Sequence, residues 1–467
     1  MLKVCEQAIR QYAVVLVVNL STFTSGMNIA WPSPMLVKLG DGTQTILSHP
    51  LTIEEGSWIV SAESLGCVIY NPLVALLLDY IGRKYCVLLG VLPKMAAALL
   101  YVFATEVWMV IFARALQGLS DSFVFISIPV YISEISSKDK RGAFCTYFQI
   151  FSSLGIVFTL SAGPFMSYLL FNIAYAVIVG ITSLPLLFLP ESPYFLLNKG
   201  EESDAMNVLT FLHGSELLAK QEIKECTIKT NEEKLSMFAV LKSSTVRKTL
   251  AISITFCFGA QLVGYNAVAY YLQTILISTN TSVMPEIASV VIGVIQFISS
   301  LCTMFLTDRF GRKIILIFSL IGMCIGLIGL GLFFRLMPSD GETIIGFLNY
   351  LPLISLIIVV YCFNAGLGSL ICVILAELFD GPARAFGVSI SLAVNTMMIF
   401  VTSKFFPMVL ESIGPAVTYW CFAGVAILMC LFVTFCIPET KGKSFAEIQR
   451  ELEWKKNETL DIDSKCF

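Results

Sequence analysis

Acidic and basic residues recur in the same order in the two halves of this 467-residue chain. Residues 79–84 and 308–313 share the pattern Asp-x-x-Gly-Arg-Lys. Carboxylates beside arginines form charge-assisted, often bidentate, hydrogen bonds. Such groups suit ion pairs that can form and break, which makes them candidates for a two-state latch rather than for bond-making chemistry. The candidate latch residues are Asp79, Arg83, Glu134, Arg141, Glu191, Asp308, Arg312, Glu377, Arg384 and Glu439.

The spacing of these residues indicates a duplicated unit. Two pairs, Glu134 with Arg141 and Glu377 with Arg384, each stand seven residues apart, and Pro-Glu follows an apolar block at 190–191 and at 438–439. The offsets between the two copies are 229, 243 and 248, so the order holds while the spacing drifts slowly. A duplicated membrane unit is typical of transporters. The alternative, a solvated basic loop, explains one copy more easily than two.

Composition places the whole chain in a membrane. Hydrophobic residues make up 57% of it and charged residues only 13%. A bilayer crossing needs about 20 apolar residues, and continuous rather than alternating apolar runs favour helices over a membrane barrel. Twelve such runs can be counted, at 12–30, 57–78, 85–105, 107–131, 143–164, 168–189, 250–272, 286–306, 314–334, 351–377, 385–405 and 415–437.

These runs predict an all-α membrane protein of twelve transmembrane helices in two pseudo-symmetric six-helix bundles. The expected domains are residues 1–190, a cytoplasmic helical linker at 191–249, residues 250–440 and a cytoplasmic tail at 441–467. The linker has apolar residues near helical spacing, which predicts short amphipathic helices. With both termini in the cytoplasm, 25 of the 30 Lys and Arg residues fall in cytoplasmic segments, as the positive-inside rule requires.

Other site types find little support. The fourteen cysteines are scattered without metal-ligand spacing, and only two histidines exist, so we expect no metal and no cofactor. No nucleophile–base arrangement or phosphate loop is present, which argues against an enzyme. Asn280-Thr281-Ser282 is a candidate glycosylation site in a predicted outer loop.

The chain resembles sugar porters of the major facilitator superfamily over essentially its full length. The segments Trp31–Pro34 and Glu55–Trp58 further resemble the insect facilitated trehalose transporter group. The motifs that carry the family resemblance are Asp79–Lys84, Arg114–Gly118, Pro129–Ile135 with Arg141-Gly142, Pro190–Pro193, Asp308–Lys313 and Pro438–Gly442.

This resemblance implies a sugar site between the two halves, near the middle of the membrane. Sugars are held through their hydroxyl groups, so the site needs neutral donors and acceptors and an aromatic face. The alternative is that these polar residues only bridge helices. The residues at matching positions are Gln149, Gln261, Asn266, Tyr270, Gln296 and Asn395.

The chain departs from the family pattern at three places. Ala260 replaces one of two adjacent glutamines, the segment 366–372 lacks two prolines and a tryptophan, and Thr396 stands where glucose carriers often have tryptophan. Each lost hydrogen bond is worth on the order of 1 kcal/mol. We therefore expect altered specificity or poor glucose transport.

Charged residues inside the spans raise two further expectations. The first span has no Asp or Glu between residues 11 and 37, so it offers no titratable group and favours facilitated diffusion over proton symport. A lone charge in a span is costly, so pairing is expected. By depth we pair Lys94 with Asp121 and Glu63 with Arg114; the alternative is that a charge reaches an interface.

We therefore expect a facilitative carrier of a mono- or disaccharide in the plasma membrane. Its partners would be the sugar and membrane lipid, with no nucleic acid and no obligate protein partner. The alternatives are a proton-coupled sugar symporter, a sugar sensor that does not transport, and a carrier of a polyol or an organic anion. An anion would need a cation at mid-membrane, for which only Lys94 is available.

Overall fold

The computed structural model describes residues 2–43, 46–136, 141–213, 219–220, 223, 244–337, 346–379, 381–441, 443 and 447. These residues are helical almost throughout, and no β-strand occurs among them. By length and composition, eleven of the helices can cross a membrane. A shorter apolar helix, Thr146–Ala162, lies within α6 and corresponds to the one remaining predicted span, at 143–164.

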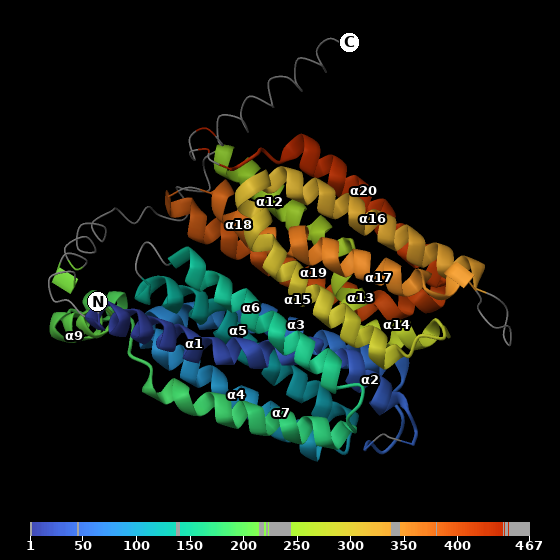
Figure 1. The fold of residues 1–467 in the computed structure, drawn as a ribbon, viewed down its shortest axis with the longest axis horizontal. Coiled ribbons are helices and arrows are strands. Elements are labelled where there is room, and N and C mark those ends of the chain that lie inside the picture. The colour runs from blue at the N-terminus through green and yellow to red at the C-terminus, as the bar shows by residue number, and fades with distance from the viewer. Residues whose placement is uncertain are drawn as a thin grey trace, which may run out of the picture. The chain divides into compact units, whose positions relative to one another are not determined.

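The chain divides into two compact units, Met1–Glu233 and Lys234–Phe467. In the first unit α1 packs against α6, and α5 packs against α3 and α4 (Figure 1). Among its described residues, the predicted linker contains the short helices α8 and α9. The elements of this unit are α1 (Leu2–Ala30), α2 (Pro32–Gly40), α3 (Ile53–Ile81), α4 (Arg83–Phe103), α5 (Val107–Ile135), α6 (Arg141–Ala162), α7 (Tyr168–Ser183), η1 (Leu184–Phe188), α8 (Pro193–Asn198) and α9 (Glu202–His213).

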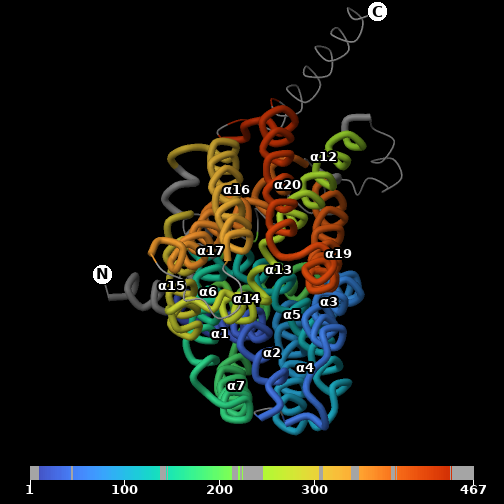
Figure 2. The backbone as a smooth tube through the Cα atoms, turned by 90° about the vertical axis from the view of Figure 1, so that its right-hand side faces the viewer, coloured from blue at the N-terminus to red at the C-terminus, as the bar shows by residue number. Residues whose placement is uncertain are grey.

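In the second unit α16 lies beside α20 and α12 beside α19 (Figure 2). Two of its spans are not plain α-helices: one is broken into α12, α13 and α14, and another contains the π-helical turn η3. The elements are α12 (Ser244–Leu262), α13 (Tyr265–Tyr270), α14 (Leu272–Ser278), α15 (Pro285–Phe310), α16 (Arg312–Leu336), η2 (Gly346–Asn349), α17 (Leu351–Cys362), η3 (Phe363–Leu367), α18 (Gly368–Leu378), α19 (Gly381–Ile413) and α20 (Pro415–Cys436).

Local sequence explains where several helices begin and why they are stable in lipid. Thr52 and Glu55 form a reciprocal capping box at the start of α3, and the Ser167 hydroxyl caps α7.

Large apolar side chains such as Leu76 and Phe188 are exposed. Apolar surface of this extent is stable against hydrocarbon rather than water.

The repeated Asp-x-x-Gly-Arg-Lys pattern forms the same joint in both units. Gly82 is the single residue between α3 and α4, with φ of 100°, and Gly311 is the single residue between α15 and α16, with φ of 85°. Only glycine adopts this left-handed backbone without strain. Both copies of the motif therefore turn the chain sharply at one residue.

Candidate functional site

Three amide side chains form a hydrogen-bonded chain in the second unit, which we call the amide cluster. Gln261 Nε2 donates to Asn395 Oδ1 at 2.8 Å, and Asn266 Nδ2 donates to Gln261 Oε1 at 2.5 Å. Gln261 is buried, whereas Asn266 and Asn395 are half-buried. These bonds leave Asn266 Oδ1 and Asn395 Nδ2 to serve as an acceptor and a donor for a hydroxyl group.

The amide cluster sits at a break in the helix. Gly264, with φ of 86°, separates α12 from α13, and an added Cβ there would come within 2.4 Å of the Phe422 ring. The break places Gln261 at the end of α12 and Asn266 at the start of α13, with Asn395 across from them on α19. Interrupted helices of this kind form ligand sites in transporters because they free polar groups inside the membrane.

Aromatic residues support this break from the neighbouring span. The rings of Tyr265 and Phe363 stack with centroids 3.6 Å apart, and Asn364 Nδ2 donates to the Tyr265 hydroxyl at 2.9 Å. Phe363 and Asn364 belong to the π-helical turn η3. The sequence pattern did not identify these two residues. The missing prolines of span ten were its only visible sign that this segment is unusual.

The other predicted sugar residues are placed as follows. Tyr270 is buried in α13, and Gln296 is buried in α15 of the same unit. Gln149 is exposed on α6 of the first unit. Among the predicted residues, direct hydrogen bonds thus join Gln261, Asn266 and Asn395.

A group of charged residues in the first unit, the N-terminal charge cluster, surrounds the α3–α4 joint. Arg83 binds Glu134 through two hydrogen bonds, Nε to Oε2 and Nη2 to Oε1, both 2.9 Å. Its Nη1 lies 3.7 Å from Asp79. Glu191 Oε1 accepts from the backbone N–H groups of Arg83 (3.0 Å), Lys84 (3.1 Å) and Ser192 (2.7 Å). The Ser192 hydroxyl donates to Glu134.

The second unit repeats this arrangement at the α15–α16 joint, as the C-terminal charge cluster. Arg312 Nη2 lies 3.0 Å from Glu377 Oε1, and the Thr440 hydroxyl donates to Glu377 Oε2 at 2.5 Å. Glu439 accepts from the backbone N–H groups of Arg312, Lys313, Thr440 and Lys441 at 3.0–3.1 Å. Arg312, Glu377, Glu439 and Thr440 thus correspond to Arg83, Glu134, Glu191 and Ser192 of the first unit.

The two charge clusters contain seven of the ten candidate latch residues; that these residues form a two-state latch stays a prediction. The hydrogen bonds above join segments of the same unit, so each cluster ties its own helix joint to the segment that leaves its last span. Ser192 and Thr440 were not predicted, although they follow the two repeated Pro-Glu pairs and could have been found from that repeat. Arg384 is exposed. The side chains of Arg141 and Asp308 lie outside the part of the chain that the structure describes.

Glu439 lies beyond the last span, and its surroundings change its acidity. Burial by itself raises the pKa of Glu439, but the N–H groups of Lys441, Arg312, Lys313 and Thr440 together outweigh burial and lower it below the ordinary 4.5. Since the folded-state pKa is the lower one, the stabilisation is present above pH 4.5 and is lost as the pH falls through the folded-state value.

We therefore expect Glu439→Gln to reduce thermal stability at neutral pH, with the difference from wild type shrinking below pH 4.5. Thermal unfolding in detergent between pH 7 and pH 3.5 measures this. Glu411→Gln, an exposed carboxylate on α19, serves as the control. A difference that stays constant across this pH range would contradict the assigned role.

The buried charges of the first unit form a network around Asn28. Arg114 is fully buried, pairs with Glu63, and donates from Nη1 to Asn28 Oδ1 at 2.8 Å. Asn28 Nδ2 in turn donates to Asp121 Oδ2 at 2.9 Å. The structure thus contains the Glu63–Arg114 pair, and Asn28 links it to Asp121 on α5.

The predicted direct pair of Lys94 with Asp121 is not the arrangement in the structure. Lys94 Nζ donates to the Ser21 carbonyl and the Thr24 hydroxyl, both at 3.0 Å, and to the Ser25 hydroxyl at 2.8 Å. These three acceptors all lie on α1. The two residues were paired by their similar depth, but depth says nothing of the direction in which each side chain leaves its helix.

Comparison with known proteins agrees with this architecture. The family model described as "Sugar (and other) transporter" matches residues 14–452. The facilitated trehalose transporters Tret1 of Culex quinquefasciatus and Polypedilum vanderplanki are 31% and 29% identical to this chain. Each match covers 95% of this chain, and 86% and 88% of the respective relatives.

A solved structure shows the same fold. The xylose transporter XylE of Escherichia coli, in a partially occluded inward-open conformation, superimposes with a TM-score of 0.77 at 20% identity, over 93% of this chain and 99% of that one. A further XylE structure identifies that protein as a major facilitator superfamily member. The prediction of a membrane transporter rather than an enzyme is thereby confirmed, and this chain belongs to the sugar transporter family.

Proposed function

We propose that this protein is a facilitative transporter that moves a mono- or disaccharide, such as trehalose or a hexose, across the plasma membrane by alternating access. The observation that carries the proposal is the amide cluster at the helix break of the second unit, in a chain of the sugar transporter family. Neutral amides with unused polar atoms match the hydroxyl groups of a sugar. The similarity of this chain to facilitated trehalose transporters favours trehalose among the candidate sugars.

Uptake into liposomes tests the proposal. We expect purified protein to take up labelled trehalose until the inside and outside concentrations are equal. Asn395→Leu removes the partner of Gln261 and a donor for the sugar, so we expect the apparent affinity to fall about tenfold, since each hydrogen bond is worth about 1 kcal/mol and an unpaired amide adds to the cost. Thr402→Val on the same helix is the control, because the Thr402 hydroxyl donates to the carbonyls of Met398 (2.9 Å) and Ile399 (3.2 Å) of its own helix.

Failure would have clear forms. Equal uptake by Asn395→Leu and wild type would remove the amide cluster from the sugar site. Binding of sugar without uptake would instead support the sensor alternative.

Restoring the family residue with Ala260→Gln tests the expected weakness toward glucose. Ala260 is fully buried, so the folding of this variant is checked alongside.

Proton coupling is the second candidate, and the network around Asn28 bears on it. The first span contributes the neutral Asn28 to this network, Asp121 of α5 accepts from it directly, and Glu63 of α3 is joined to it through Arg114. We favour facilitated diffusion because the first span itself carries no carboxylate. Accumulation above the outside concentration that collapses with an uncoupler would favour the symporter instead.

Glycosylation tests the proposed orientation, with both termini in the cytoplasm. Asn280 is exposed in the turn after α14, with φ of 46°. We expect Asn280 to carry a glycan in a eukaryotic host, so that glycosidase treatment and Asn280→Gln give the same shift in gel mobility. Access of a membrane-impermeant thiol reagent to Asn280→Cys on intact cells is the second readout; labelling only after permeabilisation would contradict the orientation.

A further inference from the structure

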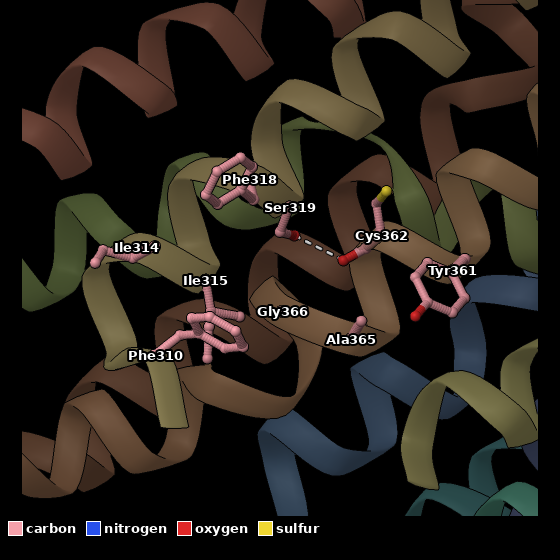
Figure 3. A pocket seen from close by; sticks show the side chains of 9 residues that line it. All are labelled: Phe310, Ile314, Ile315, Phe318, Ser319, Tyr361, Cys362, Ala365 and Gly366. Atoms are coloured by element: carbon pink, nitrogen blue, oxygen red, sulfur yellow. Dashed lines mark hydrogen bonds between the residues drawn. The ribbon is translucent and has the colours of Figure 1, made fainter. Parts of the chain in front are cut away.

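A pocket unrelated to the amide cluster opens on the surface of the second unit. It has a volume of about 380 Å³ and lies between the end of α15, the first turns of α16, and the junction of α17 with η3 (Figure 3). Phe310, Ile314 and Phe318 form its exposed rim, with Phe318 69% exposed. Ile315, Ser319 and Gly366 form its buried floor.

The π-helical turn shapes this floor. Ser319 Oγ donates to the Cys362 carbonyl at 2.7 Å (Figure 3) and accepts from the Leu367 N–H at 3.1 Å. One hydroxyl thus bridges the carbonyl just before the π-helical turn and the N–H of its last residue. Ala365 and Gly366 present little side chain to the pocket (Figure 3). A wide turn lined by small residues leaves a hollow where a regular span would be filled.

The chemistry of the pocket excludes a sugar and favours a hydrocarbon chain. The Ser319 hydroxyl is already engaged as donor and acceptor. Most of the remaining lining is aliphatic or aromatic carbon. A polyhydroxylated ligand would lose its hydrogen bonds to water without replacement, which costs more than burial returns, whereas an apolar chain gains from every contact.

The neighbouring charges indicate which apolar ligand fits. Arg309 is exposed directly before Phe310 of the rim, and Lys441 Nζ donates to the Arg309 carbonyl at 2.9 Å. Both basic residues thus lie at the helix end where the pocket begins. Ser319 is seven residues into α16, or roughly 10 Å at 1.5 Å per residue, a depth inside one leaflet of a hydrocarbon core about 30 Å thick.

We propose that this pocket binds an acyl chain of an anionic phospholipid, whose phosphate is held by Arg309 and Lys441. Basic residues at the end of a span attract anionic headgroups. The floor of the pocket is the same π-helical turn that carries Phe363 and Asn364, which hold Tyr265 beside the amide cluster. A seated lipid therefore lies directly behind the helix break of the second unit.

Photo-cross-linking tests the proposal with a phosphatidylglycerol that carries a diazirine in its acyl chain, in phosphatidylcholine nanodiscs. We expect mass spectrometry to place the label within residues 310–319 and 361–366. Ala365→Phe fills the floor and should reduce this labelling at least threefold. Ile325→Phe, at an exposed position further along α16, should leave it unchanged.

The headgroup is tested separately. Arg309→Gln should lower labelling by the phosphatidylglycerol probe and leave labelling by a phosphatidylcholine probe unchanged. On the wild-type protein, excess unlabelled phosphatidylglycerol should compete better than the same excess of phosphatidylcholine, which needs no variant to fold. Equal competition by the two lipids would overturn the anionic headgroup, and label spread along α16 in proportion to exposure would overturn the pocket.

Discussion

Glu63→Gln should lower the free energy of unfolding by about 3–5 kcal/mol, because it leaves the buried Arg114 guanidinium without its counter-charge. The cost is high since Arg114 is fully buried inside the first unit. Its other partners include the Asn28 side chain and the carbonyls of Ile59 (3.1 Å) and Asn28 (3.1 Å), which are neutral. They orient the guanidinium but cannot neutralise it.

Thermal unfolding and the monodisperse fraction in detergent measure this loss. Glu54→Gln is the matched control, because Glu54 is exposed in the first turn of the same helix. The double variant Glu63→Gln with Arg114→Gln should recover part of the stability, since neither member of this pair is then left without its counter-charge. If Glu63→Gln were no worse than Glu54→Gln, the buried ion pair would contribute nothing to the fold.

The same region shows what sequence could and could not predict. The spans were predictable because hydrocarbon demands long apolar runs whatever their partners. Arg114 needed a carboxylate, and depth alone correctly selected Glu63. For Lys94 depth selected Asp121, but the α1 oxygens of Ser21, Thr24 and Ser25 hold its ammonium instead. Hydroxyl-bearing residues are so common in spans that their pattern singles out none of them.

The two irregular spans of the second unit also differ in how far the sequence predicts them. The break at Gly264 lies within the segment that resembles the family's sugar site, so its importance was visible in the residues Gln261 and Asn266. The π-helical turn at 363–367 has no such signature, because inserting a residue into a helical turn changes no apolar residue to a polar one. The pocket beside it was therefore beyond sequence analysis.

The repeated glycine of the charged motif gives the second large expected effect. Gly82→Ala should cost about 1–3 kcal/mol for its backbone, because φ of 100° with ψ of 169° is a region that essentially only glycine occupies. It should cost about 2 kcal/mol more because the added Cβ would lie 2.5 Å from Glu191 Oε2. That contact forces Glu191 away from the N–H groups of Arg83, Lys84 and Ser192, and hydrogen bonds to charged groups are worth about 1.5–3 kcal/mol each.

Two other glycines separate these costs. Gly414 (φ 81°, ψ 157°) has backbone angles close to those of Gly82 (φ 100°, ψ 169°) and Gly311 (φ 85°, ψ 160°), and nothing lies within 4 Å of an added Cβ there. Gly414→Ala should therefore measure the backbone term alone. Gly200 (φ 82°) also has open space around an added Cβ, so Gly200→Ala measures the cost of a positive φ in the first unit. Gly82→Ala and Gly311→Ala should both exceed Gly414→Ala, because their Cβ atoms would meet Glu191 Oε2 at 2.5 Å and Glu439 Oε2 at 2.8 Å.

Thermal and denaturant unfolding of the four variants decide the question. If all four lost the same stability, the glycines would serve only the turn, and the positions of Glu191 and Glu439 would not depend on the missing Cβ atoms. If only Gly82→Ala and Gly311→Ala were severe, the Asp-x-x-Gly-Arg-Lys motif would be explained as one device. Glycine would then let two helices meet at a single residue. The first N–H groups of the second helix would reach a carboxylate, with the same geometry in each half of the duplicated chain.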